Sequence, residues 1–480
     1  MPARPNIVLL VADDHRFDAA GSLGTPALRT PALDALAARG AALTRTHIEG
    51  GWSGAVCVPS RACLLAGTGV FSATRPRGAR EAAADGPAAA CAAWQDSELD
   101  PGRSLLPEVL RAAGYRTHGI GKWHNGRAAF ARAFAGGARI FFGGMADHRD
   151  VPLHDYDPTG RYPEGAAVPS GRLRGAGDPP DLRPDAGFSS TVFADAAIAF
   201  LRSAAGSAEP FFLYVAFTAP HDPRTPPPGY ALYPAADVDL PPNWLPEHPF
   251  DNGELGVRDE RLAGLPRDPD ELRRHIADYH GMVGHLDAQV GRILEALHAA
   301  GLQRDTVVAY TADHGLALGQ HGLLGKQNLY ECSVRVPLIL AGPGIPADGR
   351  RVDGLHHAHD LLPTLCALAG VPAPEGIDGR SLLPLLAGRP GAARPYVHAV
   401  YRDVQRMVGD GRWKLIRYYR SARGCGTDRL QLFDLAEDPW EMADLAAEGA
   451  AAGHAARLAD ELSRWQRQVG DPLAAVPVRP

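Results

Sequence analysis

The sequence predicts an α/β protein with a large, mostly parallel sheet sandwiched by helices and a smaller C-terminal α+β domain that contains an antiparallel sheet. Short, continuous apolar runs, as at residues 6–12, 211–217 and 306–311, are typical of strands buried on both faces. Segments with helical spacing alternate with these runs, and this alternation indicates a parallel sheet. Functional side chains of such sheets gather at the carboxyl ends of the strands.

The elements follow one another regularly along most of the chain. Expected strands cover residues 6–12, 42–47, 116–121, 211–217, 306–311 and 336–341. Expected helices cover residues 31–39, 59–66, 104–113, 269–300 and 360–369. Long loops without sustained periodicity are predicted at residues 72–103, 146–187 and 222–268. Because such loops in a compact domain are often functional, the last two are expected to form walls of a substrate pocket.

The pattern changes after Gly388. Residues 412–418 and 430–435 predict adjacent strands, and residues 455–469 predict a closing helix. A chain of 480 residues is too long for one ordinary core. We therefore predict a catalytic domain over residues 1–394 and a C-terminal α+β subdomain over residues 395–480.

Composition restricts the classes of partner. A formal net charge of −6 argues against a nucleic-acid partner, and the apolar runs are too short to span a membrane. No secretory signal pattern precedes the first strand, so the expected location is the cytoplasm. The 6 cysteines show no CxxC spacing, which argues against a disulfide framework and a zinc ribbon.

The segment Cys57-Val58-Pro59-Ser60-Arg61 follows a glycine-rich loop and opens an apolar helical pattern. Pro59 suits the first helical turn, because its missing N–H has no partner there. Cys57 is therefore expected at a helix start, where free N–H groups and the helix dipole stabilise negative charge. Arg61 falls on the same face one turn later. These features fit a thiolate nucleophile, and a packed cysteine is the alternative.

Two strand ends carry acidic residues. Asp13 and Asp14 follow one predicted strand, and Asp313 and His314 follow another. Adjacent carboxylates repel unless a cation or proton neutralises them, so two such ends in one sheet indicate a shared cation. Oxygen ligands favour Ca²⁺ or Mg²⁺, whereas an imidazole is more typical of Zn²⁺ or Mn²⁺. An Asp-Asp pair in a turn or at a helix cap is the alternative.

Several segments together resemble the type I sulfatases, whose nucleophile is a Cα-formylglycine made from cysteine. Cys57-x-Pro-Ser-Arg followed by Leu64-Leu65-x-Gly67 resembles the signature around that cysteine, although Ala66-Gly67-Thr68 stands where many relatives have Thr-Gly-Arg. Residues 6–14, 114–124, 311–315, 325–326 and 432–439 resemble further segments in the family's order. The resemblance implies an alkaline-phosphatase-like fold and hydrolysis of an organic sulfate monoester to alcohol and sulfate.

The resemblance also implies a metal centre. Asp13, Asp14, Asp313 and His314 would bind Ca²⁺ together with the formylglycine derived from Cys57. Mg²⁺ and Mn²⁺ are the alternatives. A hydrated formylglycine has two hydroxyls on one carbon, so one can attack sulfur while loss of a proton from the other releases sulfate.

The remaining implied residues are cations and bases. Arg61 would hold the hydrated aldehyde, and His124 would orient its second hydroxyl and accept that proton. Lys122, His221 and Lys326 would bind the sulfate oxygens, and His221 or Lys326 would protonate the leaving alcohol. Taken singly, each of these side chains also fits an ordinary surface or turn position.

The expected partners are a small sugar, aryl or alkyl sulfate and, during maturation, a formylglycine-generating enzyme. Side chains in strand-end loops that are candidates for contact with the organic part of the substrate are His15, Trp52, His148, Arg149, Arg224, Asn252 and Arg258. Two other functions remain open: hydrolysis of phosphate or phosphonate esters in the same fold, and non-catalytic anion binding with an unmodified Cys57.

Other titratable clusters have simpler explanations. The run from His356 to Asp360 looks like a metal cluster, but Asp360 is better explained as a helix N-cap. His275, His280 and His285 lie on a long helix and are interpreted as solvated or packed histidines. Cys63 lacks the Pro-Ser-Arg context and is interpreted as packed.

Overall fold

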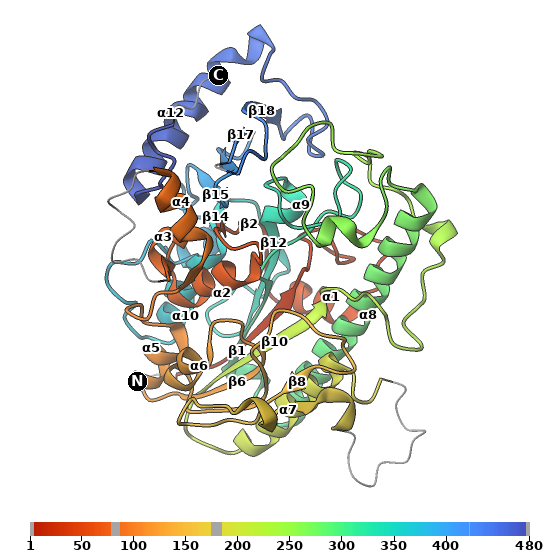
Figure 1. Ribbon diagram of the computed structural model, residues 1–480. Coiled ribbons are helices and arrows are strands. Elements are labelled where there is room, and N and C mark those ends of the chain that lie inside the picture. The colour runs from red at the N-terminus through yellow and green to blue at the C-terminus, as the bar shows by residue number, and fades with distance from the viewer. Residues whose placement is uncertain (1–3, 78–86, 174–184, 422, 477–480) are drawn as a thin grey trace.

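The larger sheet of the computed structural model has nine strands in the order β13-β2-β12-β11-β1-β10-β6-β7, with β14 paired to β2 (Figure 1). The structure describes residues 4–77, 87–173, 185–421 and 423–476. The strands are β1 (Asn6–Asp13), β2 (Ala41–His47), β6 (Arg116–Lys122), β7 (Gly136–Phe141), β10 (Phe211–Pro220), β11 (Thr306–Ala312), β12 (Arg335–Ala341), β13 (Arg350–Val352) and β14 (His356–His357).

The sheet is mostly parallel, as predicted. β1 lies at its centre between β10 and β11 and pairs in parallel with both. β6 continues the parallel set beyond β10, and β7 continues it beyond β6. β12 is the exception, because it pairs antiparallel with both β11 and β2. The carboxyl ends of β1, β6, β10 and β11 therefore meet at one edge of the sheet.

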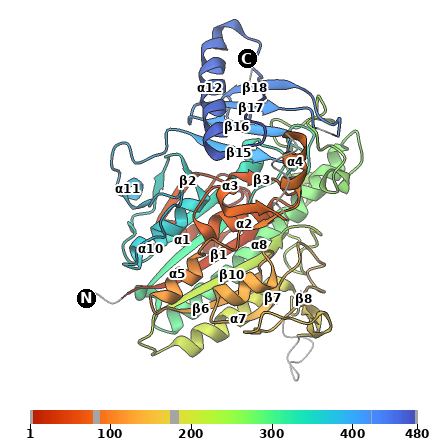
Figure 2. The same cartoon turned by 60° about the vertical axis from the view of Figure 1, so that its left-hand side comes forward.

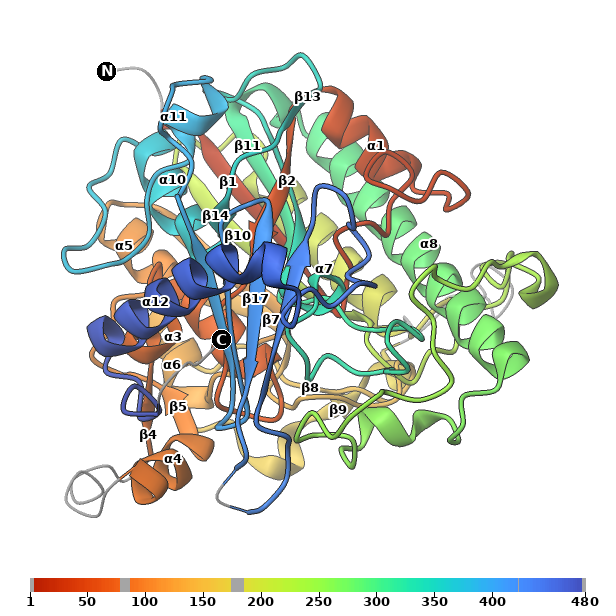
Figure 3. The ribbon, with the colours of Figure 1, turned by 90° about the horizontal axis from the view of Figure 1, so that it is seen from above.

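Helices cover both faces of the sheet (Figure 3). α1 (Pro31–Ala38), α7 (Ser189–Ala204) and the long α8 (Pro269–Ala299) pack together on one face. α2 (Cys57–Ala66), α5 (Leu106–Ala112) and α10 (Leu361–Leu368) pack together on the other. α2 begins at Cys57 and not at Pro59, since the first turn already forms over the two residues before the proline.

Short elements occupy segments that were predicted as loops. They are α3 (Val70–Ala73), β4 (Thr74–Pro76), α4 (Pro87–Gln95), β5 (Ser97–Leu99), β8 (Pro152–Leu153) and β9 (Val168–Pro169). These elements are too short, or in α4 too uniformly alanine-rich, to give a periodic signal. The other short helices are α6 (Arg127–Ala133), α9 (Glu331–Val334) and α11 (Leu383–Leu386). Residues 78–86 and 174–184 of the predicted loops lie outside the described residues.

A second sheet of five strands, in the order β18-β17-β16-β15-β3, stands above the first (Figure 2). Its strands are β15 (Val397–Tyr401), β16 (Gln405–Gly409), β17 (Trp413–Tyr418), β18 (Arg429–Asp434) and β3 (Gly50–Gly51). α12 (Ala452–Val469) packs on β16 and β17. The sequence indicated β17, β18 and α12 but not β15 and β16. The domain boundary at residue 395 stays a prediction, because β3 from the N-terminal part pairs with β15.

Asp360 occupies the N-cap position of α10, as predicted, but its side chain makes no capping hydrogen bond to that helix. Its carboxylate accepts hydrogen bonds from the backbone N–H groups of His357 and Arg380 and from the Arg394 guanidinium. It therefore ties three separate segments together. Among the described residues, no helix combines the length and the apolar character that a bilayer crossing requires.

We predict that Gly121→Ala destabilises the protein far more than Gly114→Ala. Both glycines have positive φ, +83° and +89°. A Cβ at Gly121 would lie 1.9 Å from the carbonyl oxygen of Ala216 on β10, whereas a Cβ at Gly114 meets nothing within 4 Å. We expect a loss of about 1–2 kcal/mol for Gly114→Ala and about 3 kcal/mol or more for Gly121→Ala. Free energies of unfolding from denaturant titrations check this, and equal losses would contradict it.

Candidate active site

The pairing of β1 with β11 brings the predicted acidic residues together. Ala12 is in register with Ala312, so the residues that follow them leave the sheet at the same edge. Asp14 has a φ of +65°, a left-handed conformation that aspartate tolerates better than most residues. Its backbone N–H points at Asp313 Oδ1 across 3.4 Å. The carboxylates of Asp13, Asp14 and Asp313 therefore lie close together in the protein interior.

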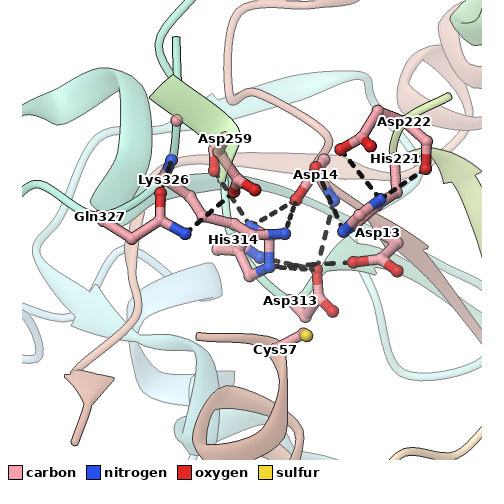
Figure 4. A network of polar contacts seen from close by, with 12 residues as sticks. Asp13, Asp14, Cys57, His221, Asp222, Asp259, Asp313, His314, Lys326 and Gln327 are labelled. Carbon is pink, nitrogen blue, oxygen red and sulfur yellow. Dashed lines mark hydrogen bonds and ion pairs between the residues drawn. The ribbon is translucent and has the colours of Figure 1, made fainter. Parts of the chain in front are cut away.

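Cys57 faces this acidic group from the first turn of α2 (Figure 4). Its Sγ lies 3.2 Å from His124 Nδ1 and 3.7 Å from Lys122 Nζ. Burial raises the pKa of the Cys57 thiol, but Lys122 and His124 outweigh burial and hold this pKa well below its usual range. The cysteine thus lies in an electropositive position at a helix start, as predicted.

Each carboxylate has its own cation. Arg61 Nε donates to Asp313 Oδ2 over 2.8 Å, and neither side chain is exposed to solvent. Lys326 Nζ lies 2.8 Å from Asp14 Oδ1. Lys122 pairs in the same way with Asp13. These pairs lie on different elements, so the strand ends and α2 are held together by charge.

Burial and neighbouring charges shift the pKa values of the acids and of His314. Burial raises the pKa of Asp13, but Lys122 outweighs this and holds it well below its usual range. Lys326 has the same effect on Asp14. Burial and the charge of Asp13 raise the pKa of Asp313. Burial lowers the pKa of His314, but Asp313 opposes it and the balance raises the pKa to about 10. The raised pKa values of Asp313 and His314 show that the carboxylates of this cluster favour a further positive charge beside them, either a proton or another cation.

Four of these residues form a candidate metal site. Asp13, Cys57, Asp313 and His314 are buried, and each offers a ligand atom within 4.8 Å of the others. His314 Nε2 lies 3.6 Å from Asp313 Oδ1 and 3.8 Å from Asp13 Oδ1. Within the described part of the chain, Asp13 Oδ1 and His314 Nε2 have no hydrogen-bond partner. Buried polar atoms usually have partners, so these atoms fit a cation that bridges them.

His221 follows β10 and reaches the same cluster. Its Nε2 lies 3.9 Å from Asp14 Oδ2, and its Nδ1 lies 2.8 Å from the Asp222 carbonyl oxygen. The His221 carbonyl in turn accepts a hydrogen bond from His148 Nε2 at 2.9 Å. Burial, with Lys326 nearby, lowers the pKa of His221 to about 4. His221 is therefore neutral at pH 7.

An open cavity of about 350 Å³ leads to Cys57, and residues of four separate segments line its mouth. They are Gly54, Ala55, Gly144, Met145, Val257, Arg258, Asp259 and Gln327. Of the seven predicted substrate contacts, only Arg258 lines this cavity, paired with Asp222 and Asp259. The segment 222–268 thus forms a wall, as predicted, whereas none of the described residues of 146–187 lines the cavity.

The other predicted substrate contacts serve the fold. Trp52 is fully buried and packs on Phe71 and Trp94. His15 is buried, with Nδ1 2.5 Å from the Tyr310 hydroxyl. His148 supports His221, and the Arg149 and Arg224 guanidinium groups stand over aromatic rings. Asn252 is buried and accepts from the Glu254 N–H.

The sequence did not point to several polar residues of the site. The Tyr214 hydroxyl accepts from Arg61, and the Gln327 amide donates to Asp259 Oδ2 over 2.9 Å beside Lys326. Tyr214 lies in a continuous apolar strand, and Asp259 in a loop without periodicity. Neither pattern distinguishes a site residue from its neighbours. The interpretation of His285 as packed is confirmed, since it is buried and lies 3.1 Å from Asp185 Oδ2.

Comparison with known protein families gives two matches. The family model Sulfatase matches residues 5–371, and the model N-sulphoglucosamine sulphohydrolase, C-terminal, matches residues 319–468. The chain belongs to the sulfatase family. The resemblance predicted from the sequence is therefore confirmed, and the protein is a hydrolase of sulfate esters.

Sequence similarity to individual relatives covers nearly the whole length of this sulfatase. An arylsulfatase of Clostridium perfringens (strain 13 / Type A) is 28% identical over 474 residues, covering 92% of this chain and 90% of the relative. The multifunctional alkaline phosphatase superfamily protein PehA of Trinickia caryophylli is 29% identical, covering 98% and 96%. A solved structure of a protein in complex with its substrate D-glucosamine-2-N,6-O-disulfate has a TM-score of 0.76 at 22% identity, covering 98% of both chains. This likeness supports the predicted fold.

We predict that Arg61→Met lowers the free energy of unfolding by about 3–5 kcal/mol, because it leaves the buried Asp313 carboxylate without its cation. Arg273→Met is the matched control. Arg273 pairs with Asp270 over 2.8 Å, but Asp270 is 80% exposed, so this loss should stay below about 1 kcal/mol. Urea titrations of the three proteins check the difference. Similar losses for both variants would show that the buried pair does not hold the site together.

Proposed function

We propose that Cys57 is oxidised to formylglycine and that the mature protein uses this residue to hydrolyse a sulfate monoester. The main support is the place of Cys57: buried at the start of α2, in contact with His124 and Lys122, and within reach of two carboxylates. The hydrate of formylglycine carries two hydroxyls, so it supplies both a nucleophile for sulfur and a route to release sulfate. A formylglycine-generating enzyme is then a partner during maturation.

The proposed metal ligands are Asp13, Asp14, Asp313 and His314, with the side chain at position 57. Their unpartnered atoms fit a divalent cation, and the mostly oxygen donor set favours Ca²⁺, with Mg²⁺ or Mn²⁺ as alternatives. Such an ion, when bound, would act as a Lewis acid that stabilises negative charge at the reacting oxygens.

The cations around position 57 have separate proposed tasks. Arg61 pairs with Asp313, and its second terminal nitrogen has no hydrogen-bond partner among the described residues. That nitrogen can donate to the hydrated aldehyde. Lys122 Nζ, near position 57, stabilises charge on the sulfate oxygens. His124 Nδ1, 3.2 Å from Cys57 Sγ, can accept the proton of the second hydroxyl.

We propose that Lys326 and not His221 donates a proton to the leaving alcohol. Burial lowers the pKa of His221 to about 4, and a nearby divalent cation would lower it further. His221 is therefore neutral at pH 7. Its Nδ1 carries the proton that points to the Asp222 carbonyl oxygen, so Nε2 has a lone pair and no proton to give to the leaving alcohol. Burial lowers the pKa of Lys326, but Asp14 outweighs this and raises it, so Lys326 keeps its proton.

The organic part of the substrate would lie at the cavity mouth. Arg258, Asp259 and Gln327 offer polar contacts there, and Met145 and Val257 offer apolar ones. Such a mixed lining fits a sugar ring or an aryl group. The relatives named as arylsulfatase and as bound to a disulfated glucosamine support the same two classes. We also propose a cytoplasmic location.

A second activity has support from one relative. PehA is named a multifunctional alkaline phosphatase superfamily protein, and it is similar to nearly the whole of this chain. The same cations would bind the oxygens of a phosphate or phosphonate ester. The third possibility is a protein that only binds anions and keeps an unmodified Cys57. The experiment below distinguishes these three possibilities.

Coexpression with a formylglycine-generating enzyme tests the function. We expect the peptide that contains Cys57 to show the mass loss of conversion from thiol to aldehyde, and turnover of 4-nitrophenyl sulfate to rise with the converted fraction. Turnover should fall by about 10³-fold or more in Cys57→Ala. The control is protein made without the modifying enzyme.

Three outcomes would contradict the proposal. No conversion of Cys57, together with no turnover of any ester, would favour an anion-binding protein. Turnover of phosphate or phosphonate esters far above that of sulfates would favour the second activity. Full turnover by unmodified protein would exclude formylglycine as the nucleophile.

Leaving-group dependence tests the assignment of the acid. For aryl and alkyl sulfates, Lys326→Met should lower kcat/KM about 10²–10⁴-fold for poor leaving groups and much less for 4-nitrophenol, which leaves without a proton. His221→Gln should lower all rates by a similar factor. The measurement is the slope of log kcat/KM against leaving-group pKa. A steeper slope in His221→Gln than in Lys326→Met would reverse the assignment.

A further inference from the structure

A second cluster of ligand atoms lies outside the proposed active site. Glu49, His357 and His359 are buried, and each offers a ligand atom within 4.8 Å of the others. They come from the β2–β3 connection, from β14 and from the turn before α10. From the sequence alone, the histidines of residues 356–359 are not expected to bind a metal. The fold adds Glu49, which is about 310 positions away in the sequence, to two of them.

The imidazoles of His357 and His359 stack with ring centroids 4.8 Å apart and an interplanar angle of 18°, so one ring must rotate for both to bind the same ion. His357 Nδ1 lies 3.3 Å from the carbonyl oxygen of His47, so Nδ1 is the donor and Nε2 keeps a free lone pair. Metal-binding histidines usually donate their other N–H to a carbonyl in this way. His359 is 2% exposed, and its Nε2 has no hydrogen-bond partner among the described residues. Burial lowers the pKa of both imidazoles, so both are neutral, as metal ligands must be.

Glu49 is a buried carboxyl whose ionised form lacks a partner cation. Its Oε2 accepts from the Val70 N–H at 2.6 Å, and in the described part of the chain no ion pair reaches it. Gly69 makes room for the carboxyl group, because a Cβ there would lie 2.5 Å from Oε2. Burial, with Asp378 nearby, raises the pKa of Glu49 to about 7. A cation at the cluster would therefore stabilise the carboxylate form.

The cluster is open on one side. Glu49, His357 and His359 line a cavity of about 240 Å³ together with two further acids, Asp378 and Glu461, and with Arg380, Arg394 and Arg464. The cavity gives an ion a route from solvent and leaves space for a water molecule as a further ligand. It is separate from the cavity that leads to Cys57, since the two share no lining residue.

We propose that Glu49, His357 and His359 bind a Zn²⁺ ion. Two imidazoles and one carboxylate, with a fourth position for water, are a common donor set for zinc, and Ca²⁺ prefers oxygen ligands throughout. The site would connect the segment that leads into β3 with the turn before α10. It would therefore brace the part of the fold on which the C-terminal sheet and α12 rest.

Zinc content in the presence of excess Ca²⁺ tests the site. The full-length protein and its Glu49→Gln and His359→Gln variants are stripped with a chelator, incubated with ZnCl₂ and millimolar CaCl₂, desalted and analysed for bound metal. We expect about one equivalent more zinc in the wild type than in either variant. His298→Gln, at the exposed end of α8, is the control and should keep the wild-type content. Comparison of matched proteins cancels any zinc at the active site.

Equal zinc content in the wild type and in folded Glu49→Gln and His359→Gln would overturn the proposal. Circular dichroism and sulfate ester turnover report folding, because neither residue belongs to the proposed catalytic set.

A second test uses only the wild-type protein with Cys57 unmodified, so its result does not depend on how the variants fold. The visible absorption spectrum is recorded after Co²⁺ is added. Binding at Glu49, His357 and His359 should give visible d–d bands without a thiolate charge-transfer band, because no cysteine belongs to this set. If Co²⁺ gives only spectra with the thiolate band, it binds at Cys57 alone and the proposal fails.

Discussion

Three carboxylates meet at one buried edge of the sheet, and the rest of the site follows from the need to neutralise them. Asp13, Asp14 and Asp313 lie where β1 and β11 end, away from water. Coulombic repulsion there is stronger than at a surface, because the surroundings have a lower dielectric constant. Arg61 and Lys326 compensate part of this charge from other elements. The shape of the site is therefore fixed by charge pairs between elements far apart in the sequence.

The same balance explains why the site is prepared for an anion and a cation at once. Burial and Asp13 raise the pKa of Asp313, so pairing with Arg61 does not fully neutralise this carboxyl. Lys122 and His124 lie beside Cys57 Sγ and add positive charge there, and Lys122 also pairs with Asp13. A divalent cation among the acids and a sulfate group against the bases would complete the neutralisation.

The sequence predicted the strand ends well, because a buried parallel strand is a continuous apolar run whose last residue can be located. Asp13 and Asp313 were therefore found. Substrate contacts were predicted poorly: Trp52 packs in the core and Asp259 lines the cavity. Side-chain direction in a long loop is set by tertiary packing, which leaves no periodic signal. For the same reason no local pattern could join Glu49 to His357, since only the pairing of β14 with β2 brings those segments together.

The C-terminal sheet takes part in positioning Cys57. Gly50 and Gly51, a few residues before Cys57, form β3 and pair with Val400 and Tyr401 of β15. A Cβ at Gly50 would lie 2.2 Å from the Val400 carbonyl oxygen, and a Cβ at Gly51 would lie 2.2 Å from Pro59 in α2. Only glycine allows one segment to touch both the second sheet and α2 so closely. The start of α2 is thus fixed from both sides, by the acidic strand ends below and by the smaller sheet above.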